Sequence, residues 1–375
     1  MYAERIDRLA ESPVREILKV IDRPGMISFA GGLPARECFP ELDCSGLRQD
    51  HLQYGPSEGD LNLREQIAAS LQARGLSVDA DRVLILSGSQ QGIDLVAKLF
   101  VDKGTRVAIE LPTYVAAVQA FDLYGAEYIG YQPQQVDIKD AKLTYTIPTF
   151  QNPTGYCYSR DERQALALAC DTSGSVLFED DPYRDLVYSD CDRTPVCSFV
   201  ESAPWVYQSS FSKVYAPGLR IGYLACSEAL YPYLVRLKQA ADLHSCRISQ
   251  QLILKLLQIG DERLRDLTEF YRHRRDAFHE SLQLEFGEIA DWAVPAGGLF
   301  YWLTLNPEYK VDTRSLLPSA IEEGVAFMPG HSFYPTGIDA APAIRLNFSH
   351  STPSQARFGL GKLAKLILKS VENQD

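Results

Sequence analysis

The chain has 375 residues, of which 46% are hydrophobic and 10% aromatic, and this composition predicts a globular protein with a large core. Lys and Arg number 37 against 49 Asp and Glu, and the net charge of -12 disfavours nucleic acid or an anionic membrane as the main partner. No apolar run is long enough to span a bilayer, and the charged N-terminus lacks a signal-peptide core, so we expect a cytoplasmic protein. The 8 cysteines form no CxxC pair and the 6 histidines no ligand-spaced cluster. We therefore expect reduced, mostly buried thiols and no metal site.

In chain order, strand-like apolar runs alternate with helical periodicity up to residue 226. Ser12-Pro13 is typical of an N-cap followed by proline at the first helical position, and predicts a short helix ending near residue 23. Further helices are expected at 61–74, 93–100, 115–124 and 161–172, and strands at 83–86, 107–110, 127–131, 143–149, 175–179, 205–208 and 221–226. This alternation predicts an α/β fold with a largely parallel sheet covered on both faces.

After residue 226 the pattern changes to long helical segments at 230–259 and 262–284. Strand-like runs follow within 292–306 and 325–349, and a last helix is expected from 353 to about 371. We predict a large domain over residues 41–260 and a smaller α+β domain over residues 261–375, to which the N-terminal arm, residues 1–40, contributes.

One stretch combines a lysine with groups that bind phosphate. Lys213 is flanked by Ser210 and Ser212, and Pro217-Gly218 and then Arg220 follow. Hydroxyls and a guanidinium beside a lysine on a tight loop suggest a Schiff base to pyridoxal 5′-phosphate (PLP). A solvated lysine in a serine-rich turn explains this stretch, taken alone, equally well.

Other polar residues follow the ends of the expected strands. The strand at 83–86 leads through Ser87-Gly88-Ser89-Gln90 into a helix, and a helix N-terminus after such a loop binds anions. The loop matches neither the dinucleotide nor the nucleotide triphosphate motif. The residues expected at the carboxyl edge of the sheet are Ser89, Tyr114, Asn152, Asp180, Tyr183, Ser210 and Lys213. Ligands of open α/β sheets bind at that edge, so a site is expected there.

Six motifs in one order cover nearly the whole chain. They are Pro112-Thr113-Tyr114, Asn152-Pro153-Thr154-Gly155, Asp180-Asp181-Pro182-Tyr183, Ser210-Phe211-Ser212-Lys213, Pro217-Gly218-Leu219-Arg220-Ile221-Gly222 and Ile344-Arg345-Leu346-Asn347-Phe348. The set resembles the class I/II aminotransferases of the fold type I PLP enzymes. Ser28-Phe29-Ala30-Gly31-Gly32-Leu33-Pro34 and the segment at 149–155 make it most similar to the 2-aminoadipate/kynurenine branch.

The resemblance implies a seven-stranded, mostly parallel sheet and roles for matched residues around PLP. Lys213 is the Schiff-base lysine and later the general base, and Asp180 keeps the pyridinium nitrogen protonated. Tyr183 and Asn152 point at the phenolic oxygen, and Tyr114 stacks on the ring. A further group holds the phosphate: Ser89, Gln90, Ser210, Ser212, Arg220 and, from the neighbouring subunit, Tyr54. Lys213, Asp180 and Tyr183 are thus the expected catalytic residues.

The resemblance also implies a homodimer with shared active sites that transfers an amino group between an α-amino acid and a 2-oxo acid. One pair is expected to be glutamate and 2-oxoglutarate, with a 2-aminoadipate-like, aromatic or branched-chain partner. Arg345, with Asn152 and Gly32, is implied to bind the α-carboxylate, and Arg15 the distal carboxylate of a dicarboxylic substrate.

Alternatives remain open for several of these residues. Arg345 could pair with an internal carboxylate, Tyr114 could be plain core, and Tyr54 could pack within its own subunit. Arg15 could be a solvated helix residue, and Asp181 is expected to be a surface or capping residue.

Two other functions use the same scaffold. A β-lyase or a decarboxylase would share the cofactor residues. The effector module of a MocR-type regulator is disfavoured by the acidic charge and because the aminotransferase-like part begins within about the first dozen residues.

Overall fold

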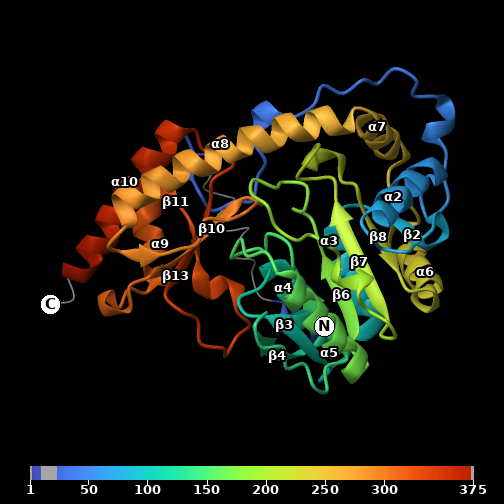
Figure 1. Ribbon diagram of the computed structural model, residues 1–375, viewed down its shortest axis with the longest axis horizontal. Helices are drawn as coiled ribbons and strands as arrows, with labels where there is room; N and C mark the ends of the chain where they lie inside the picture. The colour runs from blue at the N-terminus through green and yellow to red at the C-terminus, as the bar shows by residue number, and fades with distance from the viewer. Residues whose placement is uncertain (1, 10–22, 373–375) are drawn as a thin grey trace.

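The computed structural model describes residues 2–9 and 23–372 (Figure 1). Arg15 and the helix predicted after Ser12 lie outside the described residues. No helix in the described part of the chain is both long enough and apolar enough to cross a membrane. Within the same residues, no group of three His, Cys, Asp or Glu side chains could hold a metal ion.

A seven-stranded sheet forms the centre of the larger part of the molecule. Its strands in spatial order are β2 (Val83–Leu86), β8 (Gly222–Cys226), β7 (Trp205–Ser210), β6 (Val176–Asp180), β5 (Leu143–Thr146), β3 (Arg106–Glu110) and β4 (Glu127–Tyr131). All neighbours pair in parallel except β8, which is antiparallel to both β2 and β7. The expected mostly parallel sheet is therefore confirmed.

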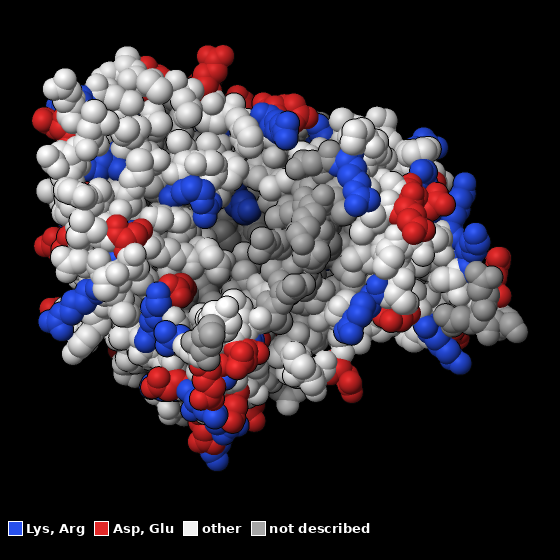
Figure 2. All heavy atoms as spheres, turned by 180° about the vertical axis from the view of Figure 1, so that it is seen from behind, with Lys and Arg blue, Asp and Glu red and all other residues white. Residues whose placement is uncertain are grey.

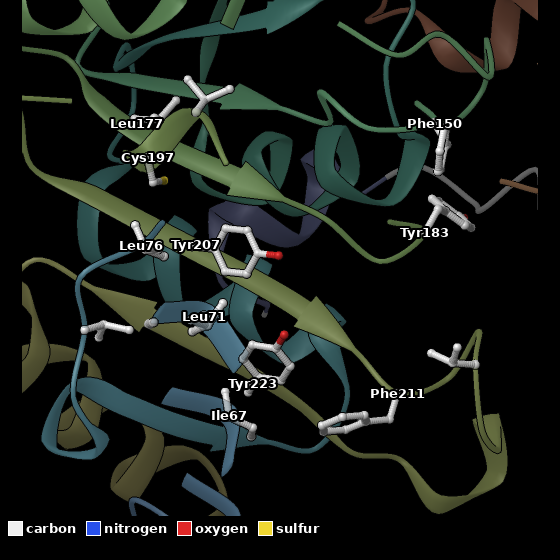
Figure 3. Close-up of a cluster of buried hydrophobic side chains, with 14 of the residues drawn as sticks. Ile67, Leu71, Leu76, Phe150, Leu177, Tyr183, Cys197, Tyr207, Phe211 and Tyr223 are labelled. Atoms are coloured by element: carbon white, nitrogen blue, oxygen red, sulfur yellow. The ribbon is translucent and has the colours of Figure 1, made fainter. Parts of the chain in front are cut away.

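Helices cover both faces of this sheet. They are α2 (Leu61–Ala73), α3 (Ser89–Phe100), α4 (Val115–Tyr124), α5 (Arg160–Ser173), α6 (Tyr231–Asp242) and α7 (Arg247–Gln258). Alternate residues of β2 belong to different cores, since Val83 and Ile85 pack in one cluster and Leu84 and Leu86 in another. Figure 3 shows part of the first cluster, where Tyr207 and Tyr223 project from neighbouring strands.

Two helix predictions need correction. The segment predicted as one helical stretch at 230–259 is two helices, because Leu243 has a φ of 65° and ends α6. In addition, α3 begins at Ser89 rather than at residue 93, with Gly88 at a φ of 84° before it. The earlier start places Ser89 and Gln90 in the first helical turn, where backbone N–H groups lack intrahelical acceptors.

A four-stranded antiparallel sheet lies in the C-terminal part, in the order β12 (Met328–Pro329), β13 (Ala343–Asn347), β10 (Phe300–Leu305) and β9 (Ala290–Asp291). The helices of this part are α8 (Gly260–Phe286), α9 (Thr313–Glu322) and α10 (Pro353–Glu372). In Figure 1, α8 runs from the end of α7 to the side of α10.

The N-terminal segment joins this C-terminal part. β1 (Ile27–Ser28) pairs in parallel with β11 (Val325–Ala326), and Phe29 packs edge to face on Phe278. These contacts support the division at residues 40 and 260, which stays a prediction.

The expectation of mostly buried thiols is wrong. All 8 cysteines are free, but only Cys170, Cys197 and Cys226 are buried. Cys44 and Cys246 are exposed and the others are half-buried. The three buried ones lie on α5, in the 3-10 helix Val196–Ser198 and on β8. Cys38 ends the 3-10 helix Arg36–Cys38, and the other four lie outside the helices and strands.

Candidate active site

The carboxyl ends of the parallel strands deliver side chains into one cavity of about 160 Å³. Asp180 is the last residue of β6 and Ser210 the last of β7, and Asn152 follows β5. The expected site residues that line it are Ser89, Gln90, Tyr114, Asn152, Asp180, Tyr183, Ser210, Ser212, Lys213 and Arg220. Ile147, Pro182 and Pro217 also line it and were missed, since apolar residues at strand ends carry no chemical signal.

The N-terminus of α3 forms one end of the cavity. Two glycines allow the close approach there: a Cβ on Gly222 would lie 2.8 Å from the Ser89 backbone nitrogen, and one on Gly88 would lie 2.4 Å from Arg220 Nη2. Arg220 itself adopts a left-handed φ of 53°, and its side chain lines the cavity. A guanidinium, two serine hydroxyls and a helix N-terminus together make an anion cradle.

The buried Lys238 on α6 holds the first turn of α3 through hydrogen bonds. Lys238 Nζ donates to Gln91 Oε1 at 2.8 Å, to Asp242 at 2.8 Å and to Ser245 Oγ at 2.9 Å. Ser87 Oγ donates to the same Asp242 carboxylate at 2.8 Å. The cradle is therefore anchored to α6 through a satisfied polar network.

Asp180 is buried with only one oxygen satisfied. Tyr145 donates its hydroxyl to Asp180 Oδ2 at 2.9 Å, whereas Oδ1 has no partner among the residues that the structure describes. Burial raises the pKa of Asp180 to about 7. A buried carboxylate oxygen without a partner is unfavourable. Asp181 Oδ1, Glu179 Oε1 and the Gln208 amide are also buried without a partner in the described chain, but of these residues only Asp180 lines the cavity, where a ligand with a hydrogen-bond donor can reach it.

Asp181 corrects a prediction, because it is fully buried rather than a surface residue. It accepts hydrogen bonds from Arg184 Nη1 at 3.0 Å and from the Tyr207 hydroxyl at 2.8 Å. Adjacent carboxylates therefore differ: the charge of Asp181 is compensated within the chain and that of Asp180 is not.

Lys213 is half-buried between the two sheets. Its Nζ donates to the Gly32 carbonyl at 3.0 Å and lies 5.8 Å from the centroid of the Tyr183 ring. Burial, with the positive charges of Arg345 and Arg220, lowers the pKa of Lys213 to about 8. A larger share of this amine is neutral at pH 7 than for a solvated lysine, as a nucleophile or base requires.

Arg345 reaches the same region from β13. The side chain is buried, and Nη1 donates to Asn152 Oδ1 at 2.7 Å, while Nη2 donates to the Ala30 carbonyl. The guanidinium carbon lies 4.2 Å from the centroid of the Phe300 ring. No carboxylate within residues 2–9 and 23–372 forms an ion pair with Arg345, so the internal pairing considered above is absent there. Burial lowers the pKa of Arg345 to about 10.

Comparison with known proteins identifies the family. The model of the aminotransferase class I and II family matches residues 34–363. The chain belongs to the class I and II aminotransferases. It is 36% identical to the 2-aminoadipate transaminase of Thermus thermophilus over 98% of this chain and 96% of that one. It is 33% identical to an aromatic-amino-acid aminotransferase of Thermococcus litoralis, over 99% of this chain and 95% of that protein.

Solved structures agree with this aminotransferase fold. The alpha-aminoadipate aminotransferase of Thermus thermophilus, complexed with N-(5′-phosphopyridoxyl)-L-leucine, has a TM-score of 0.90 and 32% identity, covering 99% of this chain and 98% of that one. A Pyrococcus horikoshii kynurenine aminotransferase has a TM-score of 0.91 and 31% identity, covering 98% and 97%. The expected fold type I architecture is confirmed.

A second buried carboxylate, that of Glu110, supports the loops that carry site residues. Glu110 accepts hydrogen bonds from the Ile147 backbone at 3.0 Å and from the Tyr158 hydroxyl. Gln151, beside the same carboxylate, donates to the Pro112 carbonyl at 2.7 Å. The loops carrying Tyr114 and Asn152 are thus tied together. The sequence offered one unused signal, a charged residue ending a buried strand.

Four expected residues are not among those that line the cavity. Arg345 and Gly32 lie next to it, hydrogen-bonded to the lining residues Asn152 and Lys213. Tyr54 is 75% exposed and contacts the His244 ring edge to face at 5.8 Å between centroids, and it does not line the cavity. Arg15 is not described. The face in Figure 2 is hollowed near its centre with basic side chains at the edge, and acidic and basic side chains are interspersed elsewhere on it.

The raised pKa of Asp180 predicts how the stability of the folded protein depends on pH. Its folded pKa is raised from 3.8 to about 7, so the ligand-free protein loses stability as pH rises between these values, by about 4 kcal/mol at most. We expect Asp180→Asn to raise the melting temperature at pH 8, with a difference that shrinks toward pH 5. Asp181→Asn, which removes a compensated charge, should lower it at pH 8. Equal destabilisation by both variants would contradict this assignment.

Proposed function

We propose that this aminotransferase uses PLP to move an amino group between an α-amino acid and a 2-oxo acid, with glutamate and 2-oxoglutarate as one pair. One observation carries the proposal: a lysine amine of lowered pKa, a buried carboxylate with an unpaired oxygen and an anion cradle line the same cavity. Each group has the chemistry that a different part of PLP requires.

The residues fit the cofactor. A protonated pyridine nitrogen would satisfy Asp180 Oδ1, the one buried oxygen of that carboxylate without a partner in the described chain. Ser89, Ser210, Ser212 and Arg220 would hold the phosphate, and Tyr114 would face the ring. When bound, PLP supplies an electron sink that stabilises negative charge at the substrate Cα.

The chain's own residues then bind the substrate and move the proton. The Arg345 guanidinium, oriented by Asn152, would bind the α-carboxylate as a bidentate pair. Lys213 Nζ, partly neutral at pH 7, would hold the cofactor covalently and, once released, accept the proton from Cα. Tyr183 and Phe300, whose rings meet edge to face at 5.7 Å, exclude water beside the amine.

Lys213 is the first test of this proposal. Lys213→Ala should retain PLP, because the cradle and Asp180 remain, but lose at least about 1,000-fold in kcat, since it removes the group proposed as nucleophile and base. Spectra of the bound cofactor and steady-state assays check both parts. Lys103→Ala, which alters an exposed lysine between α3 and β3, is the control. Normal turnover in Lys213→Ala would refute the role.

We further propose a homodimer in which Tyr54 completes the partner's phosphate cradle. Its support is the 75% exposure of Tyr54 together with the 75% exposure of nearby Leu52, since two large apolar side chains are left in solvent in the single chain. A symmetric two-fold dimer would cover both.

Complementation between subunits tests the shared site. When Tyr54→Ala and Lys213→Ala chains are co-expressed, each mixed dimer should contain one intact site, giving about one quarter of wild-type activity in a random mixture. Each parent alone should be nearly inactive. A mixture no more active than its parents, or a fully active monomer in sedimentation experiments, would exclude the shared site.

Arg15 is proposed to bind the distal carboxylate of a dicarboxylic substrate. The motif match and the 36% identity to a 2-aminoadipate transaminase support this assignment. Because Arg345 takes the α-carboxylate, a second cation is needed at the far end of an acidic substrate.

Substrate profiles test this role. Arg15→Ala should lower kcat/KM for glutamate, 2-aminoadipate and 2-oxoglutarate roughly 10- to 100-fold, since a charge-assisted hydrogen bond is lost. Leucine and phenylalanine should be little affected. Arg15→Lys, which keeps the charge, should show a smaller loss. A uniform loss over all donors, or none, would remove Arg15 from the site.

A further inference from the structure

Two thiols meet beside the active-site loops. Cys157 follows the loop that carries Asn152, and Cys191 lies in the segment after β6 and Tyr183. The two thiols interact with each other, which lowers the pKa of Cys157 and raises that of Cys191. The Cys157 thiol donates a hydrogen bond at 3.3 Å to the carbonyl oxygen of Asp192, the residue after Cys191. Both side chains are half-buried, so a small reagent can reach them.

A buried arginine faces this pair. Arg163 is fully buried, and its Nη2 lies 3.6 Å from Cys157 Sγ. The other contacts of this guanidinium are to neutral acceptors, including the carbonyls of Pro148 at 2.9 Å and Asp192 at 2.9 Å and the hydroxyl of Thr149 at 3.0 Å. Its positive charge lowers the pKa of Cys157 and also that of the nearby Asp192 carboxyl.

The thiols of the chain differ accordingly. The neighbouring Cys191 thiol and the positive charge of Arg163, opposed by burial, lower the pKa of Cys157. Burial instead raises the pKa of Cys170 and of Cys226 to about 12. Cys157 thus combines a lowered pKa, partial exposure and a neighbouring second thiol, the features of an oxidation-sensitive cysteine with a resolving partner.

We propose that Cys157 and Cys191 form a redox-active dithiol that a hydroperoxide converts to a disulfide. The Cys157 thiolate attacks one peroxide oxygen, the O–O bond breaks, and the hydroxide that leaves takes up a proton to become water. The sulfenic acid formed at Cys157 is then attacked by the Cys191 sulfur, the S–S bond forms, and a second water departs. Two thiols are oxidised by two electrons and one hydrogen peroxide is reduced to two waters.

The disulfide would join two loops of the site. One follows β5 and carries Asn152, which orients Arg345; the other follows β6 and carries Tyr183. Oxidation would therefore restrain both loops at once, independently of the substrate that the enzyme uses.

Peptide mapping of the full-length holoenzyme tests the proposal. The protein is treated with a small excess of hydrogen peroxide at pH 7, free thiols are alkylated, and the digest is analysed by mass spectrometry. We expect a linked Cys157–Cys191 peptide pair, two hydrogens lighter than the reduced pair and restored by dithiothreitol. Cys157→Ser and Cys191→Ser should each abolish it, whereas Cys44→Ser, at an exposed cysteine, should not.

Alkylation rates give a second measurement that does not depend on oxidation. Cys157 in the native protein should react with iodoacetamide at pH 7 at least tenfold faster than Cys157 in Cys191→Ala, which lacks the neighbouring thiol. Cys191→Ser, whose hydroxyl can still donate a hydrogen bond, should lose less. Oxidation that falls on Cys44 or Cys246 while Cys157 and Cys191 remain alkylatable would overturn the proposal, as would equal alkylation of Cys157 in all three proteins.

Discussion

A carboxylate buried with an unpaired oxygen is unfavourable, and the sheet around Asp180 holds it in that state. Asp180 ends β6, which pairs in parallel with β5 and β7, so the backbone cannot turn the side chain toward water. Tyr145 on β5 satisfies one oxygen and leaves the other directed at the cavity. Asp181 differs from Asp180 in having an ion pair with Arg184 and in lying outside the cavity, although its Oδ1 also lacks a partner in the described chain.

The two cations of the site likewise lack an ion-pair partner within the described chain. Lys213 and Arg345 contact carbonyl and amide oxygens rather than a carboxylate among the described side chains. Neither forms an ion pair with Asp180 within the described chain, and the three groups come from different elements: the loop after β7, β13 of the smaller sheet, and β6. A site that keeps its charges apart in this way binds a ligand carrying complementary charges, and the cofactor with its substrate carboxylate supplies them.

Much of this arrangement could be predicted from the sequence. Strands alternating with helices predicted the sheet, and the carboxyl-edge rule brought together residues as distant as Ser89 and Lys213. The rest depends on contacts between distant segments. Nothing local indicates that Tyr207 and Arg184 bury Asp181, or that α6 ends before Leu243, since residues 233–259 contain no Gly or Pro. The supporting roles of Tyr145 and Glu110 likewise arise only when neighbouring strands are in register.

The half-reaction tests the central claim most directly. The PLP-loaded protein is mixed with glutamate, 2-aminoadipate, leucine or phenylalanine without any 2-oxo acid, and the products are quantified by chromatography. The account predicts, for at least one donor, close to one pyridoxamine phosphate and one 2-oxo acid per chain, with no ammonia. Ammonia or carbon dioxide released without pyridoxamine phosphate would contradict amino-group transfer and favour lyase or decarboxylase chemistry on the same scaffold.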